Sequence, residues 1–398
     1  MTRNVLTLTV LALTAFVRPC RAETGTLFGG DLEFLRKHTG VVLLEDASHQ
    51  AQVAVVPAWQ GRVMTSAARG TAGESFGWVN RELIASGKKQ PHINVFGGED
   101  RFWLGPEGGQ YSIFFAGGVP FDFEHWFTPA SLDTEPFEVI SQSTSRVVCQ
   151  RTITFTNRIG TRFSLEVTRE VRLLKAAEAL AESAVTLPPG VSAVAYESVN
   201  TVKNTGDQPW KKETGLLSVW ILGMFNASEG TTVVIPFEKG TDAERGLAVN
   251  DTYFGKVPAE RLVVKDGVLF FRADARKRCK IGLSPRRAKP LLGSYDIAHH
   301  ILTLVRFTLP QGASEYVNSQ WKQQDDPFSG DVVNSYTDDG KLGNFYELES
   351  SSPALALQPD ASATHRHQTV HLQGGEKELD AVARAVLGVS LEAISQAF

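Results

Sequence analysis

Residues 343–359 read Gly-Asn-Phe-Tyr-Glu-Leu-Glu-Ser-Ser-Ser-Pro-Ala-Leu-Ala-Leu-Gln-Pro, and they carry more information about fold and function than any other stretch of the chain. Glu347 and Glu349 lie at alternate positions, with Leu348 between them. Because alternate side chains of a β-strand point to the same face, we expect both carboxylates on one face and Leu348 on the other. Carboxylates that face a cleft can act as general bases or bind sugar hydroxyls. The same spacing also fits two solvated glutamates on an outer sheet face.

The motif around Glu349 resembles a late strand of galactose mutarotases and related aldose epimerases, which reads Leu-Glu-Thr-Gln and precedes a proline-bearing segment and Leu-x-Pro-Gly. Here, residues 348–354 read Leu-Glu-Ser-Ser-Ser-Pro-Ala and residues 357–360 read Leu-Gln-Pro-Asp. The resemblance implies a galactose-mutarotase-like β-supersandwich over about residues 40–375, with Glu349 in the position of the catalytic base. The motifs are more similar to a secreted bacterial branch of this superfamily than to true mutarotases.

Alternation of apolar and polar residues predicts an all-β protein. Residues 163–173 alternate as a half-buried antiparallel strand does, and residues 147–156 precede them across a turn, which predicts a hairpin. Asp266-Gly267 lies between two apolar runs and predicts a second hairpin. Many strands with Gly-rich turns favour one large β-sandwich. Further strands are expected at residues 41–45, 52–66, 111–115, 137–142, 193–203, 214–223, 230–236, 279–283, 301–308, 343–349 and 366–372.

Few helices are expected. Residues 31–38 and 76–86 predict short ones. A C-terminal helix over 376–388 is predicted by apolar residues at helical spacing and by Gly388 as its stop.

The N-terminus indicates export. Arg3 precedes an uncharged apolar run, so residues 1–22 are interpreted as a signal peptide and residues 23–398 as a single mature domain in the periplasm or outside the cell. No other stretch is apolar enough to predict insertion in a membrane. Removing Arg3, Arg18 and Arg21 would lower the formal net charge from −4 to −7. This balance argues against nucleic acid as a partner, and the local basic residues 276–280 and 286–287 are interpreted as a solvated strand edge.

The cysteines and the histidines near the C-terminus are potential disulfide and metal-binding residues. Cys149 and Cys279 could form one disulfide or remain buried free thiols. His365, His367 and His371 share one face of a predicted strand, where they could line a cleft, face solvent or bind a metal. Successive residues on one strand face rarely converge on a tetrahedral site, so we expect no metal and no cofactor.

Residues 94–109 form the second informative stretch, because five glycines there accompany charged and aromatic residues. Aromatic rings stack on sugar faces, while carboxylates and Arg bind sugar hydroxyls. Binding residues also concentrate on loops. The alternative is a polar crossover loop whose acids pair with Arg101. The candidate sugar contacts of this stretch are Glu99, Asp100, Arg101, Trp103 and Glu107.

The resemblance adds residues and also departs from the family. It implies a sugar contact for Asp251, in an Asp-x-x-Phe motif, and relates Trp220 to a strand that carries the family's catalytic histidine. The chain has Phe96 where the family has its first histidine, and no histidine between His125 and His299. By chemistry, His125 is the candidate catalytic acid.

Three classes of function remain open at this point. The first is an enzyme acting on a pyranose or uronic-acid unit, as an epimerase with Glu349 as base or as a polysaccharide lyase on the same fold. The second is a non-catalytic secreted carbohydrate-binding protein, and the third is a structural β-domain without a small ligand. Neither the oligomeric state nor the sugar follows from the sequence. The predicted site comprises Glu349 and His125 as catalytic residues and, as sugar contacts, Glu99, Asp100, Arg101, Trp103, Glu107, Trp220, Asp251, Glu347, His365 and His367.

Overall fold

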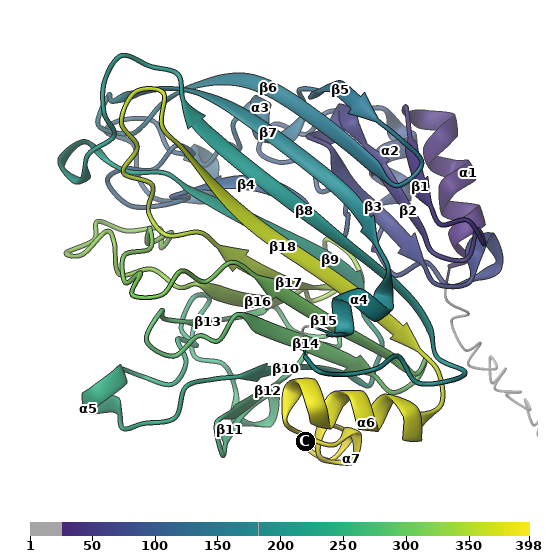
Figure 1. Cartoon of the computed structure of the whole chain (residues 1–398). Helices are drawn as coiled ribbons and strands as arrows, with labels where there is room; N and C mark the ends of the chain where they lie inside the picture. Colours follow the sequence, from purple (N-terminus) through teal and green to yellow (C-terminus); the bar gives the residue numbers. More distant parts are fainter. Residues whose placement is uncertain (1–25, 182) are drawn as a thin grey trace, which may run out of the picture.

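The computed structural model describes residues 26–181 and 183–398. The predicted signal peptide, residues 1–22, lies outside the described residues. Two large antiparallel sheets face each other and form a β-sandwich (Figure 1). The all-β prediction is therefore confirmed.

The larger sheet has ten strands and the smaller has five. In spatial order, the larger contains β11 (Leu262–Lys265), β12 (Val268–Arg272), β10 (Thr231–Pro236), β14 (Leu291–Asp296), β15 (Ile301–Phe307), β18 (Ser362–Gln373), β8 (Ser192–Asn204), β7 (Arg162–Leu174), β6 (Arg146–Thr156) and β5 (Glu138–Gln142). The smaller contains β13 (Cys279–Leu283), β16 (Val333–Thr337), β17 (Phe345–Ser351), β9 (Ser218–Asn226) and β4 (Arg101–Gly105).

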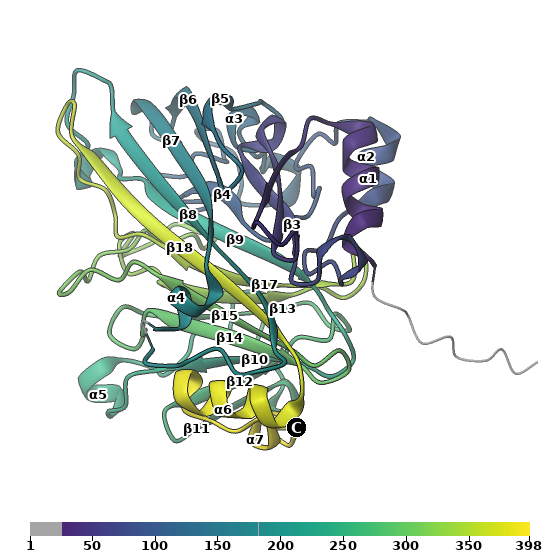
Figure 2. The same cartoon turned by 45° about the vertical axis from the view of Figure 1, so that its right-hand side comes forward.

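A third sheet lies at one end of the sandwich beside two helices (Figure 2). It consists of β1 (Val42–Glu45), β2 (Gln52–Val56) and β3 (Arg62–Ala67), and the helices are α1 (Phe28–His38) and α2 (Arg81–Ser86). Apolar side chains of α1, β2 and β3 share one core cluster. This N-terminal unit supports the segment that leads into β4.

The C-terminal helix covers the outer face of the ten-stranded sheet. Helix α6 (Glu376–Leu387) packs on β10 and β14, and its buried Leu379 and Val382 share one apolar cluster with residues of that sheet. It ends at Gly388, whose φ of 76° is the left-handed conformation that terminates helices. The prediction for this helix is confirmed. Short helices complete the described chain: α3 (Ala130–Asp133), α4 (Ala176–Ala181), α5 (Asp242–Arg245) and α7 (Leu391–Ser395).

Both predicted hairpins are confirmed, in β6–β7 and in β11–β12. Two other predictions are wrong. Residues 111–115 form no strand, because the Ser112 hydroxyl accepts the backbone N–H groups of Phe114 and Phe115 and makes a turn. The helix predicted over 76–86 begins only at Arg81, because Trp78 donates its backbone N–H to Met224 in the neighbouring strand.

Cys149 and Cys279 are both buried and free. Of the two alternatives left open by the sequence, the structure therefore has the free thiols. Burial raises the pKa of the Cys149 thiol to about 11, which keeps it protonated at neutral pH.

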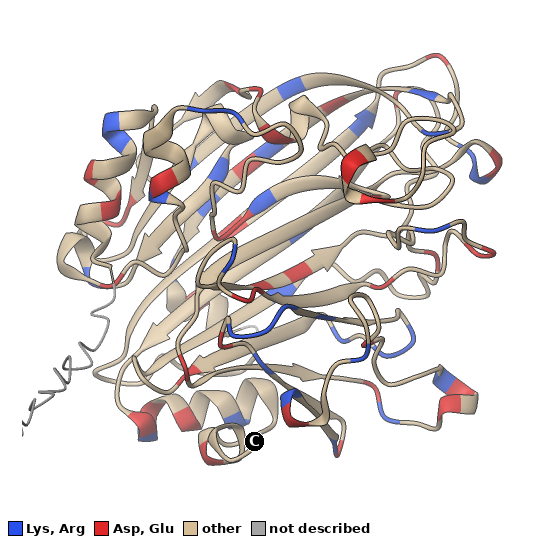
Figure 3. Ribbon diagram, turned by 180° about the vertical axis from the view of Figure 1, so that it is seen from behind, with Lys and Arg blue, Asp and Glu red and all other residues tan. Residues whose placement is uncertain are grey.

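Charged residues of both signs are interspersed over the strands and loops seen from behind the molecule (Figure 3). Within the described residues, no helix combines the length and apolar character needed to cross a lipid bilayer.

Candidate functional site

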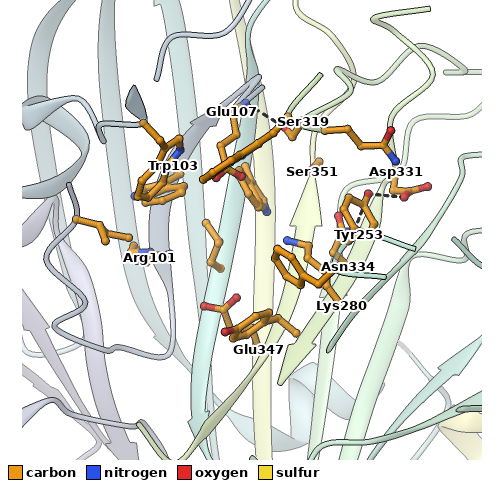
Figure 4. Close-up of a pocket in the computed structure, with 18 of the residues that line it drawn as sticks. Arg101, Trp103, Glu107, Tyr253, Lys280, Ser319, Asp331, Asn334, Glu347 and Ser351 are labelled. Atoms are coloured by element: carbon orange, nitrogen blue, oxygen red, sulfur yellow. Dashed lines mark hydrogen bonds between the residues drawn. The ribbon is translucent and has the colours of Figure 1, made fainter. Parts of the chain in front are cut away.

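A cavity of about 700 Å³ opens over the face of the five-stranded sheet that is turned away from the ten-stranded sheet. Every strand of this sheet contributes lining side chains, and Figure 4 shows how they converge from different strands. The strand residues include Arg101 and Trp103 of β4, Trp220 of β9, Lys280 of β13, Asn334 of β16 and Glu347 of β17, and loop residues such as Glu107, Trp126, Tyr253, Trp321 and Asp331 complete the lining.

The alternation of β17 determines which of its side chains can reach the cavity. Leu348 is buried in the core between the two sheets. Ser350 also points inward, where its hydroxyl lies 2.8 Å from nitrogens of both His365 and His367. Glu347 and Glu349 share the opposite face. The expectation that both carboxylates lie on one face, with Leu348 on the other, is confirmed.

Glu349 lies at the floor of the cavity and is fully buried. Lys280 donates to both of its carboxylate oxygens, at 2.9 and 3.0 Å, and Trp220 donates its indole N–H at 2.9 Å. The Lys280 ammonium also lies 4.8 Å from the centre of the Trp220 ring. These contacts occupy both oxygens of Glu349 and leave it without exposed surface, so it does not itself line the cavity.

Glu347 lines the cavity two residues earlier in the same strand. Burial, followed by repulsion from Glu349, raises the pKa of the Glu347 carboxyl well above its usual range, although Arg101 and Lys280 oppose this effect. The shift favours the protonated carboxyl. Glu347 therefore retains its proton at neutral pH.

Glu107 presents a second titrating carboxyl to the cavity from the loop after β4. Its backbone N–H is fixed by the Ser319 hydroxyl at 3.1 Å. Burial raises the pKa of the Glu107 carboxyl to about 7, while the charge of Lys280 and a hydrogen bond from Trp321 act in the opposite direction. A carboxyl with this pKa can both accept and donate a proton near neutral pH.

Tryptophans form one wall of the cavity. Trp103 lies 5.5 Å from Trp220 and 6.4 Å from Trp126, and Trp126 stacks on Trp321 at 5.5 Å. The indole N–H groups of Trp103 and Trp126 and the Nε of Arg101 are buried without a hydrogen-bond partner in the protein. A buried donor without a partner costs about 1–3 kcal/mol, so these three atoms lower the stability of the cavity wall.

The structure brings only part of the predicted site together. Arg101, Trp103, Glu107, Trp220 and Glu347 line the cavity, and Glu349 lies directly beneath them.

Glu99 and Asp100 lie between the layers, away from the cavity. Glu99 accepts from Ser66, from Tyr196 at 3.0 Å and from His371 at 3.0 Å, whereas Asp100 pairs with Arg169 at 2.5 Å. The crossover-loop interpretation predicted that these acids pair with Arg101, but neither of them does. Both carboxylates therefore hold the interior of the molecule together.

His365 and His367 are also interior residues. Burial lowers the pKa of His365 to about 3 and that of His367 to about 4, so both rings are neutral at physiological pH. Neither lines the cavity. Within the described residues, no three His, Cys, Asp or Glu side chains are grouped so that they could hold a metal ion.

Asp251 and His125 each lie next to the cavity without lining it. Asp251 pairs with Lys256 at 2.7 Å, while the following Thr252, Tyr253 and Phe254 line the cavity. His125 pairs with Asp122 at 2.6 Å on the surface. The sugar contact of Asp251 and the acid role of His125 stay predictions.

Sequence reasoning missed Lys280, Tyr253 and Asp331. The basic residues 276–280 were interpreted as a solvated strand edge, which is wrong for Lys280: it lies on the edge strand β13, but its side chain is only 12% exposed and pairs with Glu349. The sequence feature that could have identified Lys280 as a site residue was its position in a predicted strand with alternating residues. Tyr253 donates a hydrogen bond to Asp331 at 2.6 Å. The two residues lie in loops far apart in the sequence, so no local sequence pattern predicts this contact.

Comparison with known proteins supports this architecture. The model of a family described as "Family of unknown function (DUF6786)" matches residues 26–398, and the chain belongs to this family. No curated protein matches the sequence.

Solved structures with a similar fold include the Slr1438 protein from Synechocystis sp. PCC 6803, at 16% identity and a TM-score of 0.51, over 85% of this chain and 96% of that one. A "Putative aldose 1-epimerase" from Escherichia coli K12 has 11% identity and a TM-score of 0.51, over 84% and 99%. A galactose mutarotase related enzyme from Lactobacillus acidophilus has 11% identity and a TM-score of 0.48, over 83% and 97%. The galactose-mutarotase-like fold inferred from the sequence is thus confirmed.

Proposed function

We propose that the cavity on the five-stranded sheet binds a pyranose unit of a carbohydrate and transfers protons to and from it through buried carboxyls. The observation that carries this proposal is the composition of one cavity: a tryptophan wall, basic side chains, and two carboxyls with raised pKa values. Indole rings provide stacking surface for the apolar faces of a sugar, and the guanidinium and ammonium groups of the lining can donate to its hydroxyls.

The carboxyls support proton transfer as well as binding. In the proposed reaction, Glu107 accepts the proton of the anomeric hydroxyl while Glu347 donates a proton to the ring oxygen. The bond between the anomeric carbon and the ring oxygen breaks, and the anomeric carbon becomes a carbonyl carbon. After rotation, the reversed transfers close the ring in the opposite configuration. Glu349 accepts hydrogen bonds from Lys280 beneath the cavity, and repulsion from Glu349 favours the protonated form of Glu347, which donates.

Non-catalytic binding is the second candidate, because no histidine lines the cavity. The family resemblance implies a histidine acid, and the proposal replaces it with carboxyls. A lyase that acts on uronates remains an alternative reaction on the same carboxyls, and it would leave an unsaturated product.

The test is a comparison of Glu347→Gln with the parent, assayed by NMR for interconversion of the anomers in a panel of hexoses and uronic acids. We expect turnover to fall by roughly 10²–10⁴-fold, the usual contribution of general acid–base catalysis, with sugar binding retained. Glu138→Gln on the exposed strand β5 is the matched control. Binding without turnover in the parent would support the non-catalytic candidate, and an unsaturated uronate product would support the lyase. A parent that binds none of these sugars, free or in oligosaccharides, would refute the proposal.

A further inference from the structure

We propose that the cavity takes an acidic oligosaccharide, with one unit inside and neighbouring units on an apolar rim, in preference to a free monosaccharide. This inference depends on the proposed function and specifies its substrate class. Two independent features carry it: the charges of the lining and the exposed side chains at the mouth.

The basic side chains of the lining are in excess of their acidic partners. Arg101, Arg278, Lys280 and Lys322 line the cavity. Among the residues that the structure describes, only Lys280 of these four makes an ion pair, with Glu349. Arg278 instead donates to the Tyr336 hydroxyl at 3.2 Å.

The acids of the lining carry less negative charge than their number suggests. Lys280 is paired with Glu349, so Arg101, Arg278 and Lys322 remain against Glu107, Glu347 and Asp331. The raised pKa values of Glu347 and Glu107 lower the mean negative charge of these two carboxyls at neutral pH. The lining therefore has an excess of positive charge. Carboxylates are among the acidic groups found on sugars, and guanidinium groups bind them through paired hydrogen bonds.

The mouth of the cavity carries large apolar side chains that are exposed to solvent. Phe123 is 57% exposed, Leu342 is 51% exposed and Phe254 is 48% exposed, yet all three also line the cavity. A residue that both lines a cavity and faces solvent lies at its rim. Single exposed apolar residues are ordinary, but three around one mouth mark a binding surface.

Contacts below the rim rings hold them in place. The Arg278 guanidinium lies 3.9 Å from the centre of the Phe254 ring, and Tyr336 packs against the same ring edge-on at 6.0 Å. Phe123 lies 4.6 Å from His92 and stacks over Trp126 at 6.0 Å. Rings fixed in this way lose little side-chain entropy when a sugar stacks on them, as a preorganised binding surface should.

The volume agrees with this assignment. About 700 Å³ is within the range of cavities that hold drug-sized ligands, and it exceeds what one pyranose ring requires. The rim aromatics border that volume at its mouth and are suited to units on either side of the one inside. The cationic lining and the aromatic rim together fit a chain of sugars that carries carboxylates.

The test is calorimetric titration of the whole protein with uronate oligosaccharides of one to four units, from galacturonan, glucuronan and mannuronan, beside a neutral galactan series of the same lengths. We expect the acidic tetramer to bind at least about tenfold more tightly than its monomer and than the neutral tetramer. Phe254→Ala should lower tetramer affinity by roughly 2- to 10-fold, the usual contribution of an aromatic contact, and leave monomer affinity unchanged.

Two matched controls separate rim and charge effects from general damage. Phe398→Ala removes a ring that is 37% exposed and packs on Arg272 outside the lining, so it should have no effect. Arg278→Gln should weaken the acidic series and its salt dependence, whereas Lys277→Gln, beside it in sequence and outside the lining, should not.

Equal affinity for monomer and tetramer, or for acidic and neutral tetramers, would overturn this inference while leaving the proposed function intact. Loss of tetramer affinity in both Phe254→Ala and Phe398→Ala would also overturn it. Binding of neutral sugars alone would refute the acidic class. If no sugar of any kind binds, the proposed function fails together with the inference.

Discussion

The ion pair between Lys280 and Glu349 connects the edge strand β13 to β17 beneath the cavity. Glu349 has no exposed surface, so removal of Lys280 would leave a buried carboxylate without its cation. Breaking a buried pair from one side costs far more than replacing both partners by apolar residues, because the remaining charge stays desolvated.

We therefore expect Lys280→Met to lower the free energy of unfolding by about 3–5 kcal/mol and the double variant Lys280→Met/Glu349→Leu to recover most of that loss. Urea denaturation measures both. Lys175→Met is the control, because its pair with Glu178 is largely exposed and is worth about 1 kcal/mol or less. If the double variant were no more stable than Lys280→Met, the attraction within the ion pair would have to exceed the free energy that its desolvation costs.

Glu107 gives the stability of the protein a defined dependence on pH. Its pKa of about 7 lies above the ordinary glutamate value of 4.5, so the folded state binds more protons than the unfolded state between these values. The contribution of Glu107 is fully present below about pH 4.5 and is lost as the pH rises through 7. The Glu107→Gln variant has no titrating carboxyl at this position and should not show this loss. We therefore expect the variant to become more stable relative to the parent as the pH rises, by on the order of 2–3 kcal/mol near pH 8. Urea denaturation across this pH range provides the measurement, and a difference that does not change with pH would contradict the assignment.

At the residue scale, sequence reasoning located side chains that share a strand and missed those that meet across the fold. The alternation of side chains along a strand correctly predicted that Glu347 and Glu349 share one face. The same pattern could not show that Glu349 is covered by Trp220 and Lys280, since these come from positions more than sixty residues away. Burial is set by tertiary packing, and it distinguishes a residue on the cavity wall from one beneath it.

At the scale of elements, the strands that the sequence prediction missed, β4, β14 and β16, are buried almost throughout. Strand β4 reads Arg-Phe-Trp-Leu-Gly and is buried at all five positions, so it shows no alternation, and the glycines beside it favoured a loop. Strands β14 and β16 are likewise buried almost throughout. Buried strands of a sandwich lack the polar face that gives the period of two.

Helix α6 shows how an element with a clear pattern contributes to stability. Leu379 is fully buried against the outer face of the ten-stranded sheet. Leu379→Ala should lower the free energy of unfolding by about 2–5 kcal/mol, because it removes apolar contacts and leaves a cavity. Lys377→Ala, at an exposed position of the same helix, should change it by less than about 0.5 kcal/mol. Equal effects in chemical denaturation would mean that α6 is not packed on the sheet as described.

At the scale of the whole molecule, buried polar contacts join the N-terminal unit to the sandwich. The Arg169 side chain of β7 is fully buried, pairs with Asp100 and donates to the Gly61 carbonyl at 3.0 Å. Glu99 accepts from Ser66 of β3 and from His371 of β18. These acids were predicted to contact sugar, and in the structure they connect the three sheets, which places the segment leading into β4 and hence Arg101 at the cavity.

Because these contacts have no exposure to water, the three sheets should unfold together, in agreement with the predicted single domain over residues 23–398. We expect calorimetry to show one cooperative transition, and Arg169→Met to shift that entire transition downward, since it leaves Asp100 buried without its cation at a cost of about 3–5 kcal/mol. Arg146→Met, on the neighbouring strand in an exposed pair with Glu170, is the control and should shift it little. Two transitions, of which only one responds to Arg169→Met, would instead identify the N-terminal unit as a separate domain. The cavity would then owe its shape to the sandwich alone, since an independently folding unit could not fix β4.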